Sequence, residues 1–131
     1  MGGWLLLALG LSPWAMEGKG LSPPVVEMVE AASEWDALFR RERGWIGGDI
    51  AYSIPLDSQR LLWVFGDTFV GEVRGGRRVN AVMVHNSIAL QWGREAATAR
   101  IEFFWGEEEG KPTAFFRPPD GRGWFWPAHG V

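Results

Sequence analysis

The feature that most constrains this chain is an alternation of short apolar runs with turns rich in glycine and charge, from residue 45 onward. The runs contain many Val, Ile, Phe and Trp residues, which favour strands over helices. Gly and polar clusters between the runs favour tight turns. We therefore predict an all-β chain with four strands at 49–56, 61–69, 82–92 and 98–105. A polar loop is predicted at 71–80 and an acidic turn at 106–110. Further elements are predicted to begin at 112–117 and 123–127.

A short helix is predicted ahead of these strands, over residues 33–43. Ser33 stands in the N-cap position of a sequence that resembles a capping box. Gly44 is expected to end the helix. One apolar face is predicted from the helical spacing of Trp35, Leu38 and Phe39.

The N-terminal residues 1–16 are predicted to be a signal peptide. The run 4–11 is apolar and too short to span a bilayer as a helix, although no Lys or Arg precedes it. A mis-set start codon or an apolar strand are the alternatives. Residues 17–32 contain Pro23 and Pro24 and are predicted to be a linker. The expected location is secreted or in the cell envelope, with no membrane contact beyond the signal peptide.

Charge and composition narrow the classes of partner. The formal net charge is −3, the Arg77–Arg78 pair is isolated in the sequence, and no basic stripe is present, so nucleic acid is not expected as a partner. Without Cys, the chain has no disulfide framework and no thiolate metal site. The nine Trp and eight Phe residues suit either core packing or stacking on the apolar faces of sugars. Carbohydrate is the partner that we expect.

Four short antiparallel strands followed by the start of another unit are typical of one blade of a β-propeller. A sandwich or a meander in another β fold fits the same pattern almost as well. Because a propeller closes with about four to eight blades, this reading makes the chain part of a larger ring.

An acidic pair is predicted from the first hairpin. If residues 49–56 and 61–69 pair around Ser58, Asp49 lies opposite Asp67 and both side chains share one face. Two carboxylates that flank a glycosidic bond are the usual machinery of glycoside hydrolysis. The alternative is structural, since Gly-Asp pairs are common in turns and each Asp could cap backbone N–H groups. A register slip of one residue would also separate the two carboxylates.

Polar and aromatic side chains around the pair are candidate substrate-binding residues. His85 and Asn86 interrupt an apolar strand, and buried polar groups there need hydrogen-bond partners or a ligand. A structural role is the alternative for the histidine. The candidate substrate-binding set is Trp45, Tyr52, Thr68, His85, Asn86, Trp126 and His129. No spacing of His, Asp and Glu matches a standard metal motif, so neither a metal site nor another cofactor is predicted.

The stretch around the pair resembles a known family. The sequences GWIGGDIAYSIPL at 44–56, LLWVFGDTFVG at 61–71 and MVHNSIALQ at 83–91 are similar to the opening of five-bladed β-propellers in the glycoside-hydrolase group that includes arabinanases and β-xylosidases. The similarity is greatest to a propeller family long classed as of unknown function, some of whose members are endo-D-arabinanases. The tail GWFWPAHGV resembles the start of a second blade.

This resemblance implies a partial propeller over 44–131, with blade one at about 45–105 and the start of blade two at about 112–131. It implies that Asp49 and Asp67 line a central funnel as catalytic carboxylates. It also places Ile50 where the family often has Gly. The implied activity is cleavage of an arabinan-type or related polysaccharide by the complete protein and not by this stretch alone.

Two other functions remain open at this point. A non-catalytic carbohydrate-binding propeller would use the same funnel and the Trp residues without turnover. A structural propeller would use the Asp pair only to cap backbone. A channel cation such as calcium is compatible with two adjacent carboxylates, but no ligand set is readable from the sequence.

Overall fold

The computed structural model describes residues 28–128. The chain divides into two units, residues 1–30 and 31–131, and the helix and strands described lie in the second. The predicted signal peptide, most of the predicted linker and His129 lie outside the described residues.

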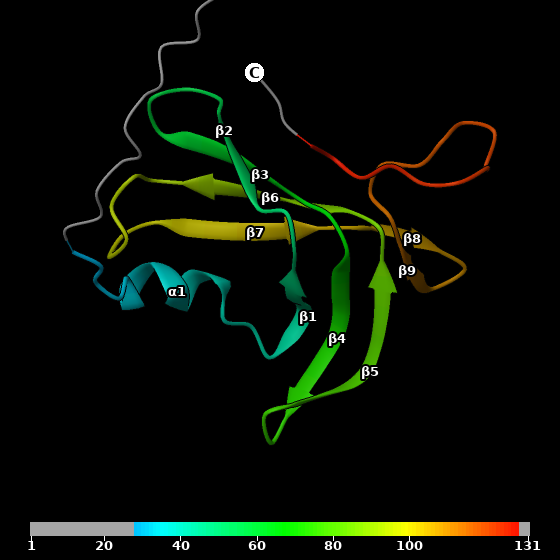
Figure 1. The fold of residues 1–131 in the computed structure, drawn as a ribbon, viewed down its shortest axis with the longest axis horizontal. Coiled ribbons are helices and arrows are strands. Elements are labelled where there is room, and N and C mark those ends of the chain that lie inside the picture. The colour runs from blue at the N-terminus through cyan, green and yellow to red at the C-terminus, as the bar shows by residue number, and fades with distance from the viewer. Residues whose placement is uncertain (1–27, 129–131) are drawn as a thin grey trace, which may run out of the picture. The chain divides into compact units, whose positions relative to one another are not determined.

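The elements, shown in Figure 1, are α1 (Ser33–Phe39), β1 (Arg43–Gly48), β2 (Tyr52–Pro55), β3 (Arg60–Phe65), β4 (Thr68–Arg74), β5 (Arg77–Val84), β6 (Ser87–Trp92), β7 (Arg100–Phe104), β8 (Gly106–Glu108) and β9 (Lys111–Thr113).

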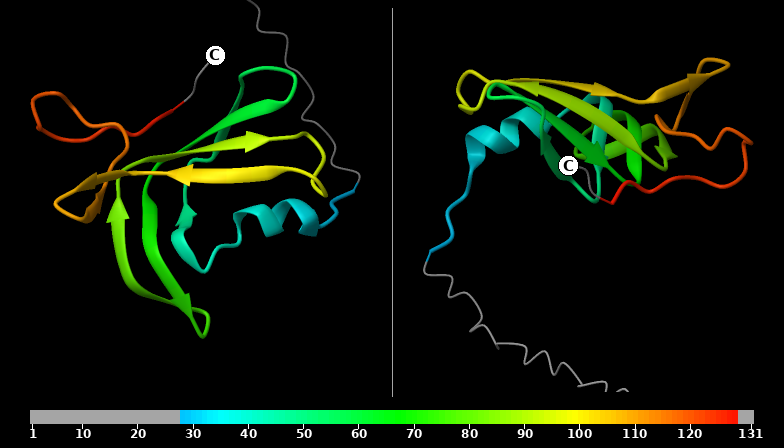
Figure 2. Two further views of the ribbon diagram at one scale, coloured as in Figure 1. Left: turned by 180° about the vertical axis from the view of Figure 1, so that it is seen from behind. Right: turned by 90° about the horizontal axis from the view of Figure 1, so that it is seen from above.

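The strands form three antiparallel sheets. One has the order β1-β4-β5, the second has the order β2-β3-β6-β7, and β8 pairs with β9. Figures 1 and 2 show the strands of the first two sheets running at a steep angle to each other. Over residues 28–128 the all-β prediction is confirmed, and the short helix expected ahead of the strands is present. The four-stranded sheet is consistent with a blade, but the blade architecture itself remains a prediction.

Two of the four strands predicted from the sequence, 61–69 and 82–92, are broken in the middle, and for them the prediction was wrong. Residues 61–69 divide into β3 and β4, and residues 82–92 divide into β5 and β6. Each pair of segments belongs to two different sheets. The breaks are residues 49–51, 66–67 and 85–86, which we call the strand corner. Strands that pass from one sheet to another bend at such corners, where glycine and polar residues replace the apolar alternation.

The register of the first hairpin agrees with the prediction. Tyr52 pairs with Val64 on one side of the strand corner, and Gly48 pairs with Thr68 on the other. Both pairs are centred on Ser58, so the register is conserved through the bend. The predicted loop at 71–80 is instead the β4–β5 hairpin, which turns at Gly75 and Gly76, where both φ angles are positive.

The turn between β2 and β3 is held by Asp57. Its Oδ1 accepts hydrogen bonds from the backbone N–H of Gln59 at 2.8 Å and of Arg60 at 2.7 Å. The Arg60 guanidinium donates to Oδ2 at 2.6 Å. The Gln59 N–H and the Arg60 side chain hold the pKa of Asp57 below its ordinary value.

The helix is shorter than predicted. Its N-cap is Ala32, with no side-chain hydrogen bond, and it ends at Phe39 rather than at residue 43. Ser33 is the first helical residue, so it is not the capping residue. Gly44, expected to end the helix, lies in β1 with φ +75°. The predicted apolar face is confirmed in part, because Leu38 and Phe39 pack against the core.

Aromatic side chains dominate the core. Trp45, Phe65, Ala89 and Ile101 are buried together. The Trp45 ring stacks on Phe103, with ring centroids 4.3 Å apart and planes at 19°. Each buried aromatic ring removes a large apolar area from water, so this cluster supplies much of the driving force for folding.

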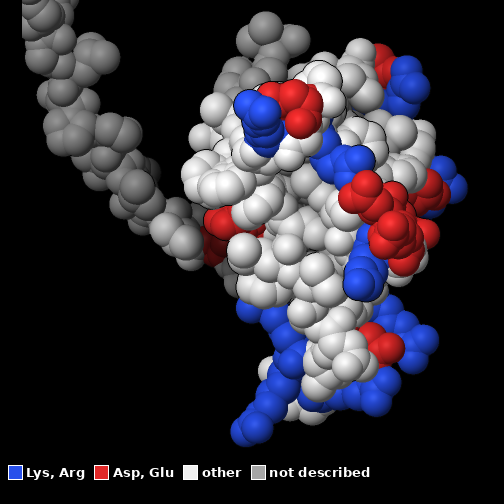
Figure 3. All heavy atoms as spheres, turned by 90° about the vertical axis from the view of Figure 1, so that its right-hand side faces the viewer, with Lys and Arg blue, Asp and Glu red and all other residues white. Residues whose placement is uncertain are grey.

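Arginine side chains gather where the β4–β5 hairpin projects, at the lower end of Figure 3. Arg77 and Arg78, an isolated pair in the sequence, are joined there by Arg43 and Arg74. Glu72 pairs with Arg43 at 4.0 Å and forms a close ion pair with Arg74. Four arginines against Glu72 and Glu42 leave this end with an excess of positive charge. The prediction that nucleic acid is not a partner is untested by this arrangement.

Ile50, in the strand corner, has φ +48°. A β-branched residue rarely adopts this left-handed conformation, which costs a non-Gly residue roughly 1–2 kcal/mol. The residue is 44% exposed, so burial offsets only part of that cost. The resemblance that places Gly at this position therefore has a backbone explanation.

We expect Ile50→Gly to be more stable than Ile50→Ala by about 1 kcal/mol, because only glycine adopts a positive φ without a Cβ penalty. Urea unfolding of the two variants compares their free energies directly, since both lack the Ile side chain. An Ala variant as stable as the Gly variant would show that position 50 is not strained.

Candidate functional site

Asp49 and Asp67 meet in the strand corner. The backbone N–H of Asp49 donates to the carbonyl of Asp67 at 3.1 Å, and Gly66 N–H donates to the Asp49 carbonyl at 2.9 Å. A Cβ at Gly66 would lie 2.5 Å from Oδ1 of Asp49, so that carboxylate rests against the glycine. The two acidic residues are therefore neighbours across adjacent strands.

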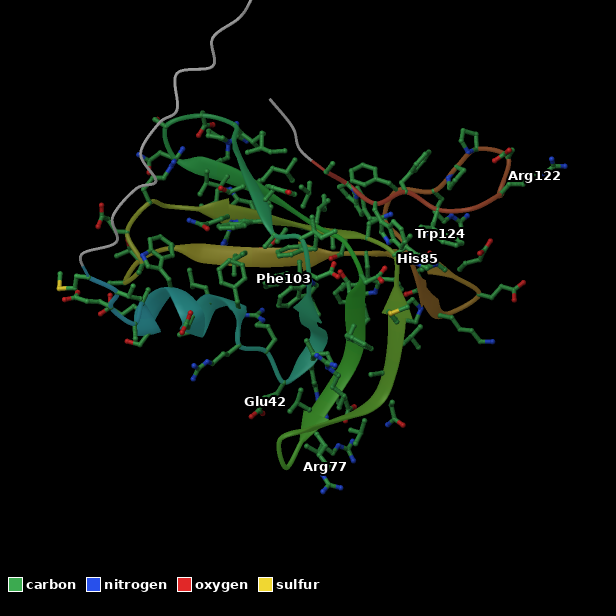
Figure 4. The ribbon with its side chains drawn as sticks, in the orientation of Figure 1. Glu42, Arg77, His85, Phe103, Arg122 and Trp124 are labelled. Carbon is green, nitrogen blue, oxygen red and sulfur yellow. The ribbon has the colours of Figure 1, made fainter. Side chains whose placement is uncertain are left out.

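Asp67 is oriented by two aromatic residues. Its Oδ1 accepts a hydrogen bond from Nε1 of Trp126 at 2.9 Å and lies 3.4 Å from Nδ1 of His85. The His85 ring stacks on Trp124, with centroids 4.6 Å apart and planes at 19°, and Figure 4 shows these two rings together. The Asp67 side chain is still 32% exposed, so it is both held in place and open to solvent.

Asp49 differs from Asp67 in its surroundings. It is exposed, and among residues 28–128 its carboxylate has neither an ion-pair nor a hydrogen-bond partner. The two carboxylates therefore differ in how they are held, because Asp67 is oriented by Trp126 and His85 and Asp49 faces solvent.

A directed chain of hydrogen bonds holds the strand corner to the core. Thr68 Oγ1 donates to the Gly66 carbonyl at 2.8 Å, so its contact with Ser87 Oγ at 2.8 Å must be one in which Ser87 donates. Ser87 in turn accepts from the Trp45 indole at 3.2 Å. Thr68 and Ser87 are both fully buried. The core therefore fixes the backbone that carries Asp67.

Asn86 ties the C-terminal loop to the strand corner. Its Nδ2 donates to the carbonyls of Phe116 at 3.0 Å and Phe125 at 2.8 Å, and its Oδ1 accepts from Phe116 N–H at 2.7 Å. The side chain is fully buried. The loop so attached supplies Trp124 and Trp126, the two rings next to His85 and Asp67.

The predicted substrate-binding residues separate into two groups. Trp45 is only 5% exposed and packs in the core, so the prediction that it stacks on a sugar is wrong for this fold. Thr68 and Asn86 are buried and make structural hydrogen bonds. Accessible to a ligand are Tyr52, His85 and Trp126, the first and last of which are 40% and 55% exposed.

Trp124 was missed among the site residues by the sequence reasoning. It is 51% exposed and lines a hollow of about 540 Å³ with His85, Arg117 and Glu108. Its motif, Trp-Phe-Trp, was visible only as the start of a new element. Two tryptophans separated by one residue next to glycine and proline are a signal that could have marked this surface.

The described residues contain no group of three or more His, Cys, Asp or Glu side chains that could hold a metal ion. The channel cation thus gains no ligand set from residues 28–128. Within the same residues, no helix has the length and apolar character needed to cross a membrane.

Comparison with known families matches residues 32–131 to the family described as Domain of unknown function (DUF5005). The chain belongs to this family. The DUF5005 region therefore includes α1, the three sheets of the described residues, and Asp67 with the residues that contact it. A comparison with curated proteins gives no match.

One solved structure resembles this DUF5005 chain, that of a "putative hydrolase" from Bacteroides ovatus. The TM-score is 0.53 and the identity is 23%, over 74% of this chain and 32% of the other. At that identity the likeness concerns the fold. The chain spans about a third of the length of the structure that it matches.

Proposed function

We propose that this DUF5005 chain contributes the acidic wall of a glycosidase site, in a propeller that acts on an arabinan-type or related polysaccharide. The observation that carries the proposal is Asp67, held by Trp126 and His85 directly across from Asp49. In this reading the four-stranded sheet is blade one. The likeness to the structure from Bacteroides ovatus, described as a "putative hydrolase", supports a hydrolase.

The chemistry follows from two carboxyl groups with separate roles. One donates a proton to the leaving oxygen as the glycosidic C–O bond breaks. The other either attacks the sugar carbon, with water cleaving that intermediate later, or removes a proton from the water that attacks directly. Trp126 and His85 restrict Asp67 to one orientation, and pre-positioned groups lower the barrier to such steps.

We expect Asp67→Asn and Asp49→Asn each to lower arabinan cleavage at least about a hundredfold, since an amide neither accepts a catalytic proton nor attacks carbon. The test uses the protein encoded by its complete gene and measures released reducing ends. Circular dichroism and urea unfolding show whether each variant keeps its fold.

Asp36→Asn is the matched control, because Asp36 is an exposed carboxylate on α1, remote from the strand corner in sequence. It should leave cleavage unchanged. Full activity in folded Asp67→Asn and Asp49→Asn variants would remove the acidic pair from the mechanism.

A second candidate, a binding module without turnover, is favoured by the exposed aromatic residues of the C-terminal loop. Trp124, Phe125 and Trp126 are 51%, 48% and 55% exposed. Such a module predicts glycan binding by the natural protein with no cleavage. Binding would then be lost on Trp126→Ala but kept on Asp49→Asn.

A further inference from the structure

The hollow beside the acidic site has the size and lining of a small-ligand site. Its volume of about 540 Å³ is within the range of about 300–1,000 Å³ typical of such sites. Trp124 and His85 contribute aromatic surface, and Pro112, Pro118 and Pro119 contribute apolar surface. We call it the Trp124 hollow.

An ion pair between Arg117 and Glu108 supplies polar groups to the same hollow. Nη1 of Arg117 donates to Oε2 of Glu108 at 2.7 Å, which joins the C-terminal loop to β8. Both side chains are about half exposed. The guanidinium has five N–H donors and the carboxylate has a second oxygen, so the pair can bind further hydroxyl groups while it stays intact.

The charges of the hollow exclude one class of sugar. Glu108 and Arg117 cancel each other, and among residues 28–128 no other Asp, Glu, Lys or Arg side chain lines the hollow. His85, which lines the hollow, also contacts Asp67, with 3.4 Å between Nδ1 and Oδ1, so a negative charge lies nearby. A uronic acid would have to break the ion pair and approach this carboxylate, whereas a neutral sugar needs neither change.

We propose that the Trp124 hollow binds one sugar ring of a neutral glycan, adjacent to the ring that is held at Asp67. The apolar face of the sugar packs on the aromatic and proline surface, and its hydroxyl groups bond to the Arg117–Glu108 pair. His85 separates the hollow from Asp67, so the two sites are consecutive along one chain of sugars. The inference rests on the proposed function because it takes a glycan as the ligand. It does not require that this glycan is cleaved.

The test titrates the full chain with arabinopentaose, xylopentaose and tetragalacturonate, followed by calorimetry. At least one neutral pentasaccharide should bind and tetragalacturonate should not. Arg117→Met should weaken the neutral ligand about tenfold, the loss expected for charge-assisted hydrogen bonds. Arg74→Met, which also removes an exposed arginine paired with a glutamate, is the control and should bind as the wild type does.

Glu108→Gln gives a second readout that a merely structural role would not produce. It leaves Arg117 uncompensated, so we expect tetragalacturonate to gain affinity while the neutral ligand loses some. The inference is overturned if neither neutral pentasaccharide binds, if tetragalacturonate binds the wild type more tightly than both, or if Arg117→Met binds unchanged. Binding without cleavage by the natural protein would overturn the proposed glycosidase alone, and cleavage without an Arg117 effect would overturn the Trp124 hollow alone.

Discussion

Replacing Trp45 with alanine should lower the free energy of unfolding by about 3–5 kcal/mol, the cost typical of deleting a buried aromatic side chain. The ring is 5% exposed, stacks on Phe103 and packs against Phe65 at 5.0 Å between centroids. The change also removes the indole donor to Ser87 and so releases the hydrogen-bond chain that holds Gly66. Urea unfolding of the full chain measures the loss.

Trp124→Ala is the matched control for this prediction. It deletes the same side chain from a position that is 51% exposed, so the loss of stability should be far smaller. A Trp45→Ala variant no less stable than Trp124→Ala would show that Trp45 is not a core residue. In that case its predicted role in sugar stacking would have to be reconsidered.

Replacing Asn86 with aspartate should cost about 3 kcal/mol or more, because the change buries a charge without a partner. The two Nδ2 donors would become a carboxylate oxygen facing the carbonyls of Phe116 and Phe125. Repulsion at both carbonyls should release the loop from the strand corner. Limited proteolysis between residues 115 and 128 and urea unfolding measure the two effects.

Two further variants separate the loop from global unfolding. Asn80→Asp makes the same change on an exposed position of β5 and should be nearly neutral. Asn86→Ala removes the three side-chain hydrogen bonds to Phe116 and Phe125, which we call the Asn86 clamp, without adding charge. It should therefore expose the loop to protease at a smaller cost in stability. A protected loop in a folded Asn86→Ala variant would contradict the clamp.

The Asn86 clamp connects stability to the site. The loop carries Trp126, which donates to Asp67, and Trp124, which stacks on His85. Each of these contacts joins residues that are far apart in the sequence, 59 positions for Trp126 and Asp67. The aromatic half of the site therefore depends on a buried amide in the strand corner.

Several features could be predicted from local patterns. Strand-forming residues alternate with turn residues, so the all-β class followed from the sequence, and the centre of the first hairpin at Ser58 followed from the spacing of the two runs. That register places Asp49 across from Asp67, as found in the paired backbone. The helix was placed correctly but made too long, because Gly44 looked like a stop signal and is part of β1.

The errors in the strand breaks and in the role of Trp45 share one physical origin, which is contact between distant segments. Residues 61–69 contain Gly66 and Asp67 at the break, but such a pair suits a polar position inside one long strand as well as a bend between two sheets. Trp45 shows the same ambiguity, since a sugar face and a core favour the same ring. Whether Trp45 is exposed depends on the side chains that pack against it, here Phe103 and Phe65.

By itself the sequence determined the all-β class, the hairpin register and the opposition of Asp49 and Asp67, because strand periodicity and turn chemistry act over a few residues. Only the tertiary structure decided that Trp45 belongs to the core, that His85, Trp124 and Trp126 gather around Asp67, and that Arg117 and Glu108 close a hollow beside them. Those decisions depend on the strand corner, where three bends and one buried asparagine bring separate parts of the chain together.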